Sequence, residues 1–107
     1  MKLGEVAHAR AGDKGGTVNI SIIPYKEEDY EKLNEILTEE RVETFFRSVL
    51  GRDIYVKKYE LPKIKALNFV IENAFSGVTY SLALDKHGKT LSYILLEMEL
   101  EDEQRKF

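Results

Sequence analysis

The spacing of apolar residues switches between two periods along this chain, which limits it to folds that combine strands with helices. Residues 17–22 alternate, with Val18, Ile20 and Ile22 on one side and Thr17, Asn19 and Ser21 on the other. Residues 39–50 instead carry apolar side chains at the i, i+3, i+4, i+7 and i+8 positions of a helix. The first segment is therefore predicted to be a half-buried strand, and the second an amphipathic helix.

Three further segments are predicted to be strands. Residues 4–9 fit a short strand, and residues 53–61 form a run rich in Tyr, Val and Ile that ends at Pro62. Residues 78–84 alternate between large apolar residues and the small residues Thr79, Ser81 and Ala83, and residues 85–88 then fit a turn.

Two helices are predicted one after the other in the middle of the chain. Residues 27–37 place Tyr30, Leu33, Ile36 and Leu37 on one side. Thr38 is the expected N-cap of the helix over 39–50, and Gly51 is the expected residue just after its C-terminus.

Two later segments are harder to assign from their spacing. Residues 65–75 place Leu67, Val70, Ile71 and Ala74 at helical intervals, which predicts a helix. Residues 89–100 fit both a helix and a strand that pairs back through the preceding turn. We favour a helix over residues 89–97.

The length fits one domain spanning residues 1–107, since domains usually hold roughly 100–200 residues. Strands interleaved with amphipathic helices bury their apolar surfaces most economically as one sheet with helices on it. The predicted class is α+β, a small mixed β-sheet with helices packed on one face, ferredoxin-like in the broad sense.

Composition excludes several classes of protein and site. The chain holds 16 Lys and Arg against 19 Asp and Glu, a net charge of −3, whereas general nucleic-acid binding needs a basic face. It has no cysteine, and no carboxylate stands at ligand spacing from His8 or His87, so neither a metal site nor a cofactor is predicted. No apolar run approaches the roughly 18 residues of a membrane span. We expect a cytoplasmic protein that binds neither nucleic acid nor membrane.

Charge is unevenly distributed along the chain. Residues 26–47 carry eight acidic and four basic residues, whereas residues 52–65 carry five basic and two acidic residues. Two interpretations are open: the two segments pair between subunits of an oligomer, or both are ordinary solvated surfaces.

The glycine-rich segment 10–16 is the main candidate for a binding site. Glycines such as Gly12 and Gly15 let the backbone approach a ligand closely, and successive N–H groups in such a loop can form a nest for an anion. Arg10 and Lys14 add positive charge, and an arginine can hold a phosphate or carboxylate through two parallel hydrogen bonds. The alternative is a simple hairpin loop with its basic residues in water.

Three other polar residues are candidates for roles in this site. His8 and Asp13 are the candidate catalytic residues. His8 could carry a proton near neutral pH, and Asp13 could either act as a base or orient Arg10 or Lys14. Asn68 lies beside an apolar stripe, where it either bonds backbone in the preceding loop or points into a cleft. A satisfied or exposed strand histidine is the alternative for His8.

Three stretches together resemble a known family, the ferredoxin-fold C-terminal domain of the acyclic terpene utilisation protein AtuA. They are residues 8–16 with Asn19-Ile20, residues 59–62 with residues 66–70, and Leu84-Asp85 with residues 88–91 and 95–98. The likeness covers nearly the whole chain in the same order. It adds Asn19 to the candidate ligand-binding residues.

The resemblance carries expectations about function and also two departures. The family loop usually reads Arg-Ser-Gly-Asp-Lys-Gly-Asp, whereas here Ala11 replaces the serine and Gly16 the second aspartate. The larger N-terminal domain of AtuA-type proteins is not part of this sequence, which implies the small domain as a separate chain. The resemblance implies a role in the breakdown of branched terpenoid acyl-CoA compounds.

Two functions follow from these observations. The first is an accessory module that forms a homo-oligomer or docks on a larger AtuA-like chain. The second is a small enzyme or binding protein for an acyl-CoA or another anionic compound, with Arg10 and Lys14 holding the anion. The residues leave open whether the chain catalyses a reaction, and a third possibility is a structural protein in which residues 10–16 are only a turn.

Overall fold

The computed structural model describes residues 1–14, 17–51, 53–72 and 91–101, and for Asp13 and Lys14 it describes the backbone alone. Four strands in this part of the chain form one sheet in the order β1-β2-β4-β3. All three pairings between these strands are antiparallel. The strands are β1 (Ala7–Lys14), β2 (Thr17–Pro24), β3 (Tyr55–Leu61) and β4 (Ala66–Glu72).

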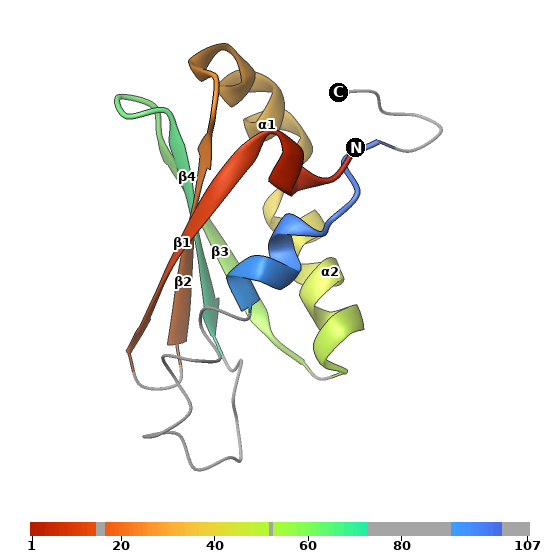
Figure 1. Ribbon diagram of the computed structural model, residues 1–107. Coiled ribbons are helices and arrows are strands. Elements are labelled where there is room, and N and C mark those ends of the chain that lie inside the picture. The colour runs from red at the N-terminus through yellow and green to blue at the C-terminus, as the bar shows by residue number, and fades with distance from the viewer. Residues whose placement is uncertain (15–16, 52, 73–90, 102–107) are drawn as a thin grey trace.

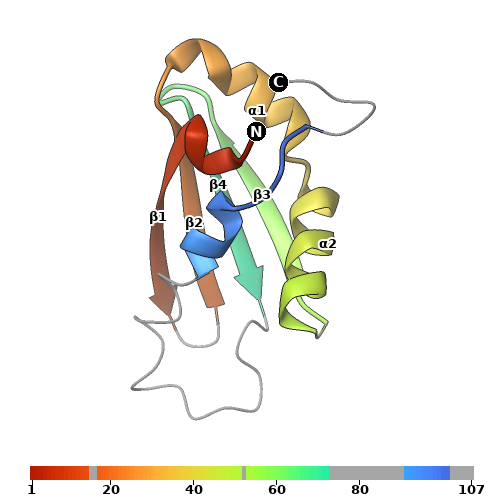
Figure 2. The ribbon, with the colours of Figure 1, turned by 45° about the vertical axis from the view of Figure 1, so that its right-hand side comes forward.

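The helices lie on one side of this sheet (Figures 1 and 2). They are α1 (Tyr30–Ile36), α2 (Glu39–Leu50) and a helical turn at residues 91–96, with short 3₁₀ helices at Leu3–Glu5 and Glu27–Asp29. None of these described elements covers the opposite side, which we call the uncovered face. The predicted α+β architecture with helices on one face is confirmed.

The hydrophobic core lies between the sheet and the helices. Phe69 of β4 and Phe46 of α2 are its largest fully buried side chains. The predicted alternation of residues 17–22 is confirmed, because Val18, Ile20 and Ile22 are all fully buried. The apolar side of the first predicted helix is also buried, through Tyr30, Leu33, Ile36 and Leu37.

Helix α2 begins and ends where the sequence predicts. The Thr38 side chain accepts a hydrogen bond of 3.1 Å from the backbone N–H of Arg41, which satisfies one of the free donors at the helix start. Gly51 ends the helix with φ of 65°, a left-handed conformation that glycine adopts without steric cost.

The helix predicted over residues 65–75 is wrong, since residues 66–72 form strand β4. Leu67, Phe69 and Ile71 are buried, so the true period is two. The strand lies between β2 and β3. Val70 is on the uncovered face, and because it is also apolar, it completes a helical spacing with Leu67 and Ile71 that the strand does not use. A short apolar run of this kind does not distinguish the two periods without its neighbours.

The first strand is displaced from its predicted position. Residues 4–9 were expected to be the strand and residues 10–16 the loop, but Leu3–Glu5 is a 3₁₀ helix and β1 continues to Lys14. Eight cross-strand pairs join β1 to β2, from Ala7 opposite Pro24 to Lys14 opposite Thr17. This continuous pairing overcomes the low strand propensity of a segment containing Ala and Gly.

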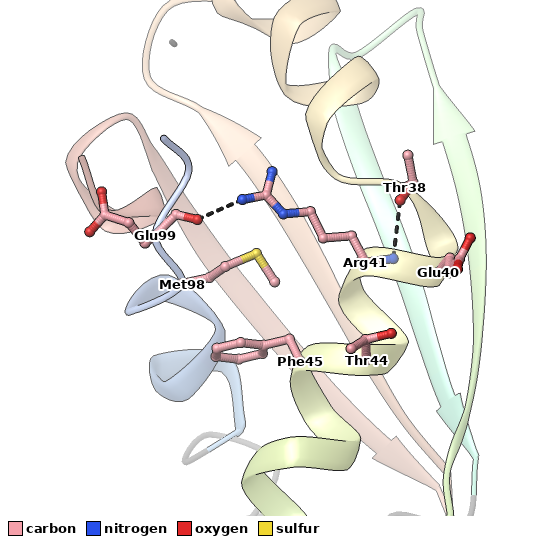
Figure 3. A pocket seen from close by; sticks show the side chains of 7 residues that line it. All are labelled: Thr38, Glu40, Arg41, Thr44, Phe45, Met98 and Glu99. Carbon is pink, nitrogen blue, oxygen red and sulfur yellow. Dashed lines mark hydrogen bonds between the residues drawn. The ribbon is translucent and has the colours of Figure 1, made fainter. Parts of the chain in front are cut away.

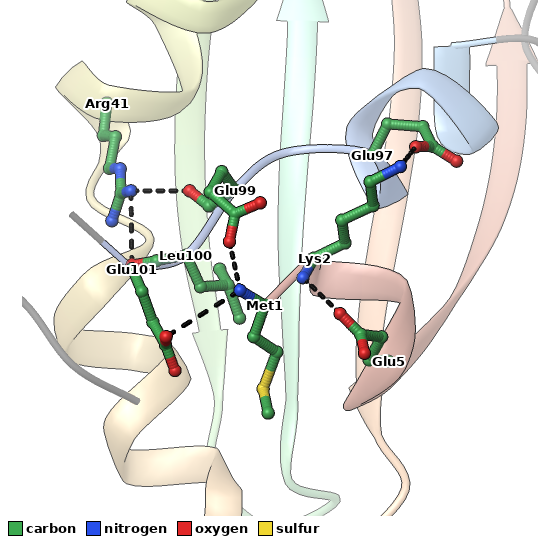
Figure 4. A network of polar contacts seen from close by, with 8 residues as sticks. All are labelled: Met1, Lys2, Glu5, Arg41, Glu97, Glu99, Leu100 and Glu101. Atoms are coloured by element: carbon green, nitrogen blue, oxygen red, sulfur yellow. Dashed lines mark hydrogen bonds and ion pairs between the residues drawn. The ribbon is translucent and has the colours of Figure 1, made fainter.

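The C-terminal segment uses both conformations that its sequence permits. Residues 91–96 are helical, within the favoured helix over 89–97, and Glu99 then forms a β-bridge with Lys2. Figure 4 shows this junction, where the Lys2 ammonium lies 2.6 Å from Glu97 and the amine of Met1 pairs with Glu99. Hydrogen bonding to these carboxylates raises the pKa of both amino groups.

The strand predicted over 78–84, the turn over 85–88 and the start of the helix over 89–97 lie outside the described residues. Within the described part of the chain, no helix has the length and apolar character needed to cross a lipid bilayer.

Candidate functional site

The uncovered face gathers several of the predicted site residues onto adjacent strands. Arg10 of β1 lies opposite Ser21 of β2, Ser21 lies opposite Asn68 of β4, and Asn68 lies opposite Tyr59 of β3. Side chains directly opposite one another in an antiparallel sheet share a face. These four residues therefore form a continuous row across the sheet, which we call the polar row.

A second row follows the polar row along the strands. Gly12 lies opposite Asn19, Asn19 opposite Val70, and Val70 opposite Lys57. Of the predicted ligand-binding residues, Arg10, Gly12, Asn19 and Asn68 thus come together on neighbouring positions of one face. The sequence had placed them in two segments with no contact between them.

Hydrogen bonds join the two rows through their amides. The Asn68 Nδ2 atom donates to Asn19 Oδ1 at 3.0 Å and to Ser21 Oγ at 2.9 Å. Both hydrogens of the Asn68 amide are used, which leaves its Oδ1 as an acceptor, the Asn19 amide as a donor and the Ser21 hydroxyl as a donor. The cluster therefore offers donors and an acceptor side by side to a group placed on this face.

Positive and aromatic side chains border this cluster. Arg10 is exposed at one end of the polar row, and Tyr59 at the other end is 51% exposed. Lys57 is exposed at the end of the second row. An exposed guanidinium can make two parallel hydrogen bonds to a carboxylate or phosphate, and a half-exposed tyrosine supplies apolar area with a polar tip.

His8 lies on the same face but not in the polar row. It pairs with Ile23, one row away, and its ring stacks on Tyr25 with 5.4 Å between centroids and an interplanar angle of 23°. The half-buried imidazole is thus held against an exposed aromatic ring at the end of the face.

The structure changes the chemistry expected of the glycine-rich segment. Residues 10–14 are extended strand, in which successive N–H groups point in opposite directions. They cannot converge on an anion, so the backbone nest predicted for this part of the segment is not formed. Asp13 pairs with Val18 and Lys14 with Thr17, while Gly15 and Gly16 lie outside the described residues.

Ser21 and Tyr59 belong to the site but were not selected from the sequence. Alternation in residues 17–22 had put Ser21 on the polar side of its strand, which was a usable signal. Tyr59 carried no such signal, because its partner Asn68 was assigned to a helix.

A second surface feature lies on the opposite side of the molecule. A groove of about 680 Å³ runs between α2 and the segment that follows residues 91–96 (Figure 3). Phe45 and Met98 form its apolar part, and the Arg41 guanidinium donates from Nη2 to the carbonyl oxygen of Glu99 at 2.8 Å. The remaining lining residues are Thr38, Glu40 and Thr44. Arg41 thereby holds the C-terminal segment against α2.

Comparison with known proteins gives one match. A family model described as the AtuA ferredoxin-like domain matches residues 1–101. The chain belongs to this family. A search of curated proteins found no match, and a search of solved structures found none either.

Membership in the AtuA ferredoxin-like domain family agrees with the sheet and helix arrangement described above. It also confirms the resemblance carried by residues 8–16 and 66–70. The first of these stretches supplies Arg10 and Gly12 to the uncovered face, and the second supplies Asn68. Among the described residues, no group of three or more His, Asp or Glu side chains is placed to hold a metal ion.

Proposed function

We propose that this chain is an accessory module that docks on a larger AtuA-like chain through the uncovered face. The complex would act in the cytoplasm in the metabolism of branched or terpenoid acyl-CoA compounds. The observation that carries the proposal is the polar row, in which Arg10, Ser21, Asn68 and Tyr59 span the uncovered face. Aromatic and arginine side chains are the types that supply most binding energy at protein interfaces.

The dimensions of the face support a protein partner. Four strands about 4.8 Å apart, with about 3.3 Å per residue, give a footprint of about 500 Å². A standard interface buries about 800 Å² on each partner. The sheet face therefore falls short of a standard interface by about 300 Å² on this chain. Exposed apolar side chains at the end of the sheet can add this area, since Tyr25 is 63% exposed and Ile64 in the β3–β4 turn is 67% exposed.

The shape of the face also supports this choice. Ligand pockets for small molecules are concave and enclose most of the ligand. A sheet face bordered by half-exposed side chains contacts a second protein surface more completely than it encloses a small molecule.

The test is binding to a large AtuA-like chain encoded in the same genome. The two chains are coexpressed, and their association is measured by size-exclusion chromatography and calorimetry. Ser21→Arg places a long charged side chain in the middle of the polar row and should abolish the complex. Ser48→Arg makes the same change at an exposed position of α2 and should leave the complex intact. Recovery of this chain without the large chain in every preparation would contradict the proposal.

A second candidate function rests on Arg10. This exposed cation lies beside the Ser21 hydroxyl and the amide cluster, an arrangement suited to the phosphate or carboxylate of an acyl-CoA or other anionic compound. In this function Arg10 and Lys14 hold the anion. His8 lies on the same face as Arg10 and is the first proton carrier to test, with Asp13 the second.

Thermal shift with acyl-CoA compounds distinguishes this second function. A ligand present at 100 times its Kd should add about 2.7 kcal/mol to the free energy of unfolding. Arg10→Ala should remove that gain, whereas Lys26→Ala, at an exposed position before α1, should keep it. Equal gains in the two variants would show that Arg10 does not hold the ligand.

A further inference from the structure

Side chains of α2 make a ladder of polar contacts along the outer edge of β3. Glu39 Oε2 accepts a hydrogen bond from the backbone N–H of Lys58 at 2.9 Å, and Glu43 Oε2 accepts one from the backbone N–H of Val56 at 3.3 Å. The third contact is between Arg47 and Ile54, where the guanidinium Nε donates to the backbone carbonyl at 3.1 Å.

The ladder follows from matched spacings in the helix and the strand. Its helix residues lie four apart, which is about 6.0 Å along a helix axis. Its strand residues lie two apart, which is about 6.6 Å along a strand. Two carboxylates meet N–H groups and a guanidinium meets a carbonyl, so each side chain has the polarity that its backbone partner requires.

Other contacts hold the ladder in place. An Arg47 Nη2 atom lies 2.7 Å from Glu43 Oε1, and the guanidinium lies over the Tyr55 ring at 5.8 Å. Val42 and Phe46 on the neighbouring side of α2 are fully buried. The helix is therefore fixed on the sheet by its apolar residues, independently of the ladder.

The ladder occupies groups that would otherwise be open to another strand. β3 is the last strand of the described sheet, and an edge strand with free N–H and C=O groups is a template for pairing with another chain. Acidic side chains that bind these N–H groups remove the template. The strand still has residues that favour strand pairing, namely Tyr55, Val56 and Tyr59.

We propose that Glu39 and Glu43 guard the β3 edge against pairing with the same edge of a second copy of this chain. The second copy is the partner that fits best, because the strand is self-complementary in one antiparallel register. When Tyr59 lies opposite its own symmetry mate, Lys58 faces Glu60 of the second copy, and Glu60 faces its Lys58. Opposite charges directly across an antiparallel pair stabilise it.

A cysteine at Tyr59 reports this pairing directly, since the chain contains no other cysteine. In the proposed register the two residues at position 59 form a pair whose Cα atoms are about 4.5 Å apart, within the range of a disulfide. A cysteine at Lys57 is the matched control, because its symmetry mate would lie four residues away along the strand, or about 13 Å.

Tyr59→Cys is made in the native chain and in a Glu39→Ala, Glu43→Ala background, and each protein is mildly oxidised. We expect a disulfide-linked dimer only in the double-alanine background. Lys57→Cys should stay monomeric in both backgrounds. Glu39→Gln with Glu43→Gln keeps the accepting oxygens and should stay monomeric with Tyr59→Cys. Absence of the dimer in the double-alanine background, or equal dimer in the native background, overturns the proposal.

Amide hydrogen exchange tests whether Glu39 protects the β3 edge if the double variant does not fold. Glu39→Ala alone should raise the exchange rate of the Lys58 amide about tenfold or more, while the Tyr59 amide, which pairs with β4, should keep its rate. An unchanged Lys58 rate overturns the proposal as well.

Discussion

Alanine substitutions in β4 distinguish the observed strand from the helix that the apolar spacing favours. Phe69 is fully buried in the strand but lies off the helical stripe of Leu67, Val70, Ile71 and Ala74. Val70 lies on that stripe but faces the uncovered side, where it is half-buried. The strand therefore predicts that Phe69→Ala lowers the free energy of unfolding more than Val70→Ala does, whereas the helix predicts the reverse.

The size of each effect follows from burial. Removing a buried phenylalanine side chain costs about 3–5 kcal/mol, because the lost transfer free energy is joined by the cost of the cavity. Phe69 lies on a central strand in contact with the helical layer, so we expect about 4 kcal/mol. Val70→Ala loses partly exposed methyl groups and some strand propensity, which together cost about 1 kcal/mol.

Urea denaturation followed by circular dichroism measures both values. With a slope of about 1.5 kcal/mol/M, the midpoint should fall by about 2.7 M for Phe69→Ala and by about 0.7 M for Val70→Ala. Phe69→Leu should fall between the native chain and Phe69→Ala, which keeps the comparison usable if the alanine variant is largely unfolded. A loss for Val70→Ala equal to or larger than that for Phe69→Ala would refute the strand assignment.

Four further substitutions test individual contacts. Thr38→Ala removes the N-cap of α2 and should cost about 1 kcal/mol, or about 4–8 °C in Tm, whereas Thr38→Ser should cost much less; equal losses would contradict the cap. Gly51→Ala forces a side chain into φ of 65° and should lower the free energy of unfolding by about 1 kcal/mol in urea titrations, with Gly51→Asn in between. Asn68→Ala breaks two hydrogen bonds at a half-buried position and should cost about 1–2 kcal/mol in the same assay, while Lys57→Ala nearby should be neutral. Burial raises the pKa of Tyr30 above its ordinary value of 10.0, so the unfolded chain loses this proton first and stability falls as pH rises above about 10; Tyr30→Phe should reduce that fall between pH 9 and 11.

The parts of the fold that the sequence predicts are those fixed by local chemistry. Helix α2 has an N-cap at Thr38, an apolar stripe and a glycine at its end, and each is a signal carried by neighbouring residues. Strand β2 alternates over its whole length, which identifies its buried side without knowledge of its neighbours.

The parts that the sequence does not predict are fixed by partners far away in the chain. Strand β4 is a strand because β2 and β3 flank it, and its own apolar spacing fits either period. Strand β1 contains Gly12 and three alanines, so its length depends on eight pairings with β2 rather than on its own propensity. Residues 97–100 leave the helix where the N-terminus bonds to them, as in the hydrogen bond from Leu3 N–H to the Met98 carbonyl.

The candidate site was also predictable only where it depends on neighbouring residues. Arg10 and Gly12 were selected from the glycine-rich segment and Asn19 from the family resemblance, and the pairing of β1 with β2 brings them to one face. Asn68 was selected as a polar residue beside an apolar helical stripe, whereas in the structure its amide donates hydrogen bonds across two strands of the sheet. Its bonds to Asn19 and Ser21 depend on the pairing of β2 with β4, which no local signal encodes.

The structure also bears on the opposite charges of residues 26–47 and 52–65, whose pairing between subunits was one of two interpretations. Glu39 and Glu43 bond to the backbone of β3, and the Lys58 ammonium donates to the Asn34 carbonyl at 2.6 Å, so part of this attraction is used within one chain. Burial lowers the pKa of Lys58, in agreement with its half-buried position. In this interpretation the acidic side chains of α2 close the β3 edge, and the polar row lies on the face that the described elements leave uncovered. In the proposed complex, association with a larger AtuA-like chain should therefore depend on substitutions in the uncovered face more than on substitutions in the acidic surface of the helices.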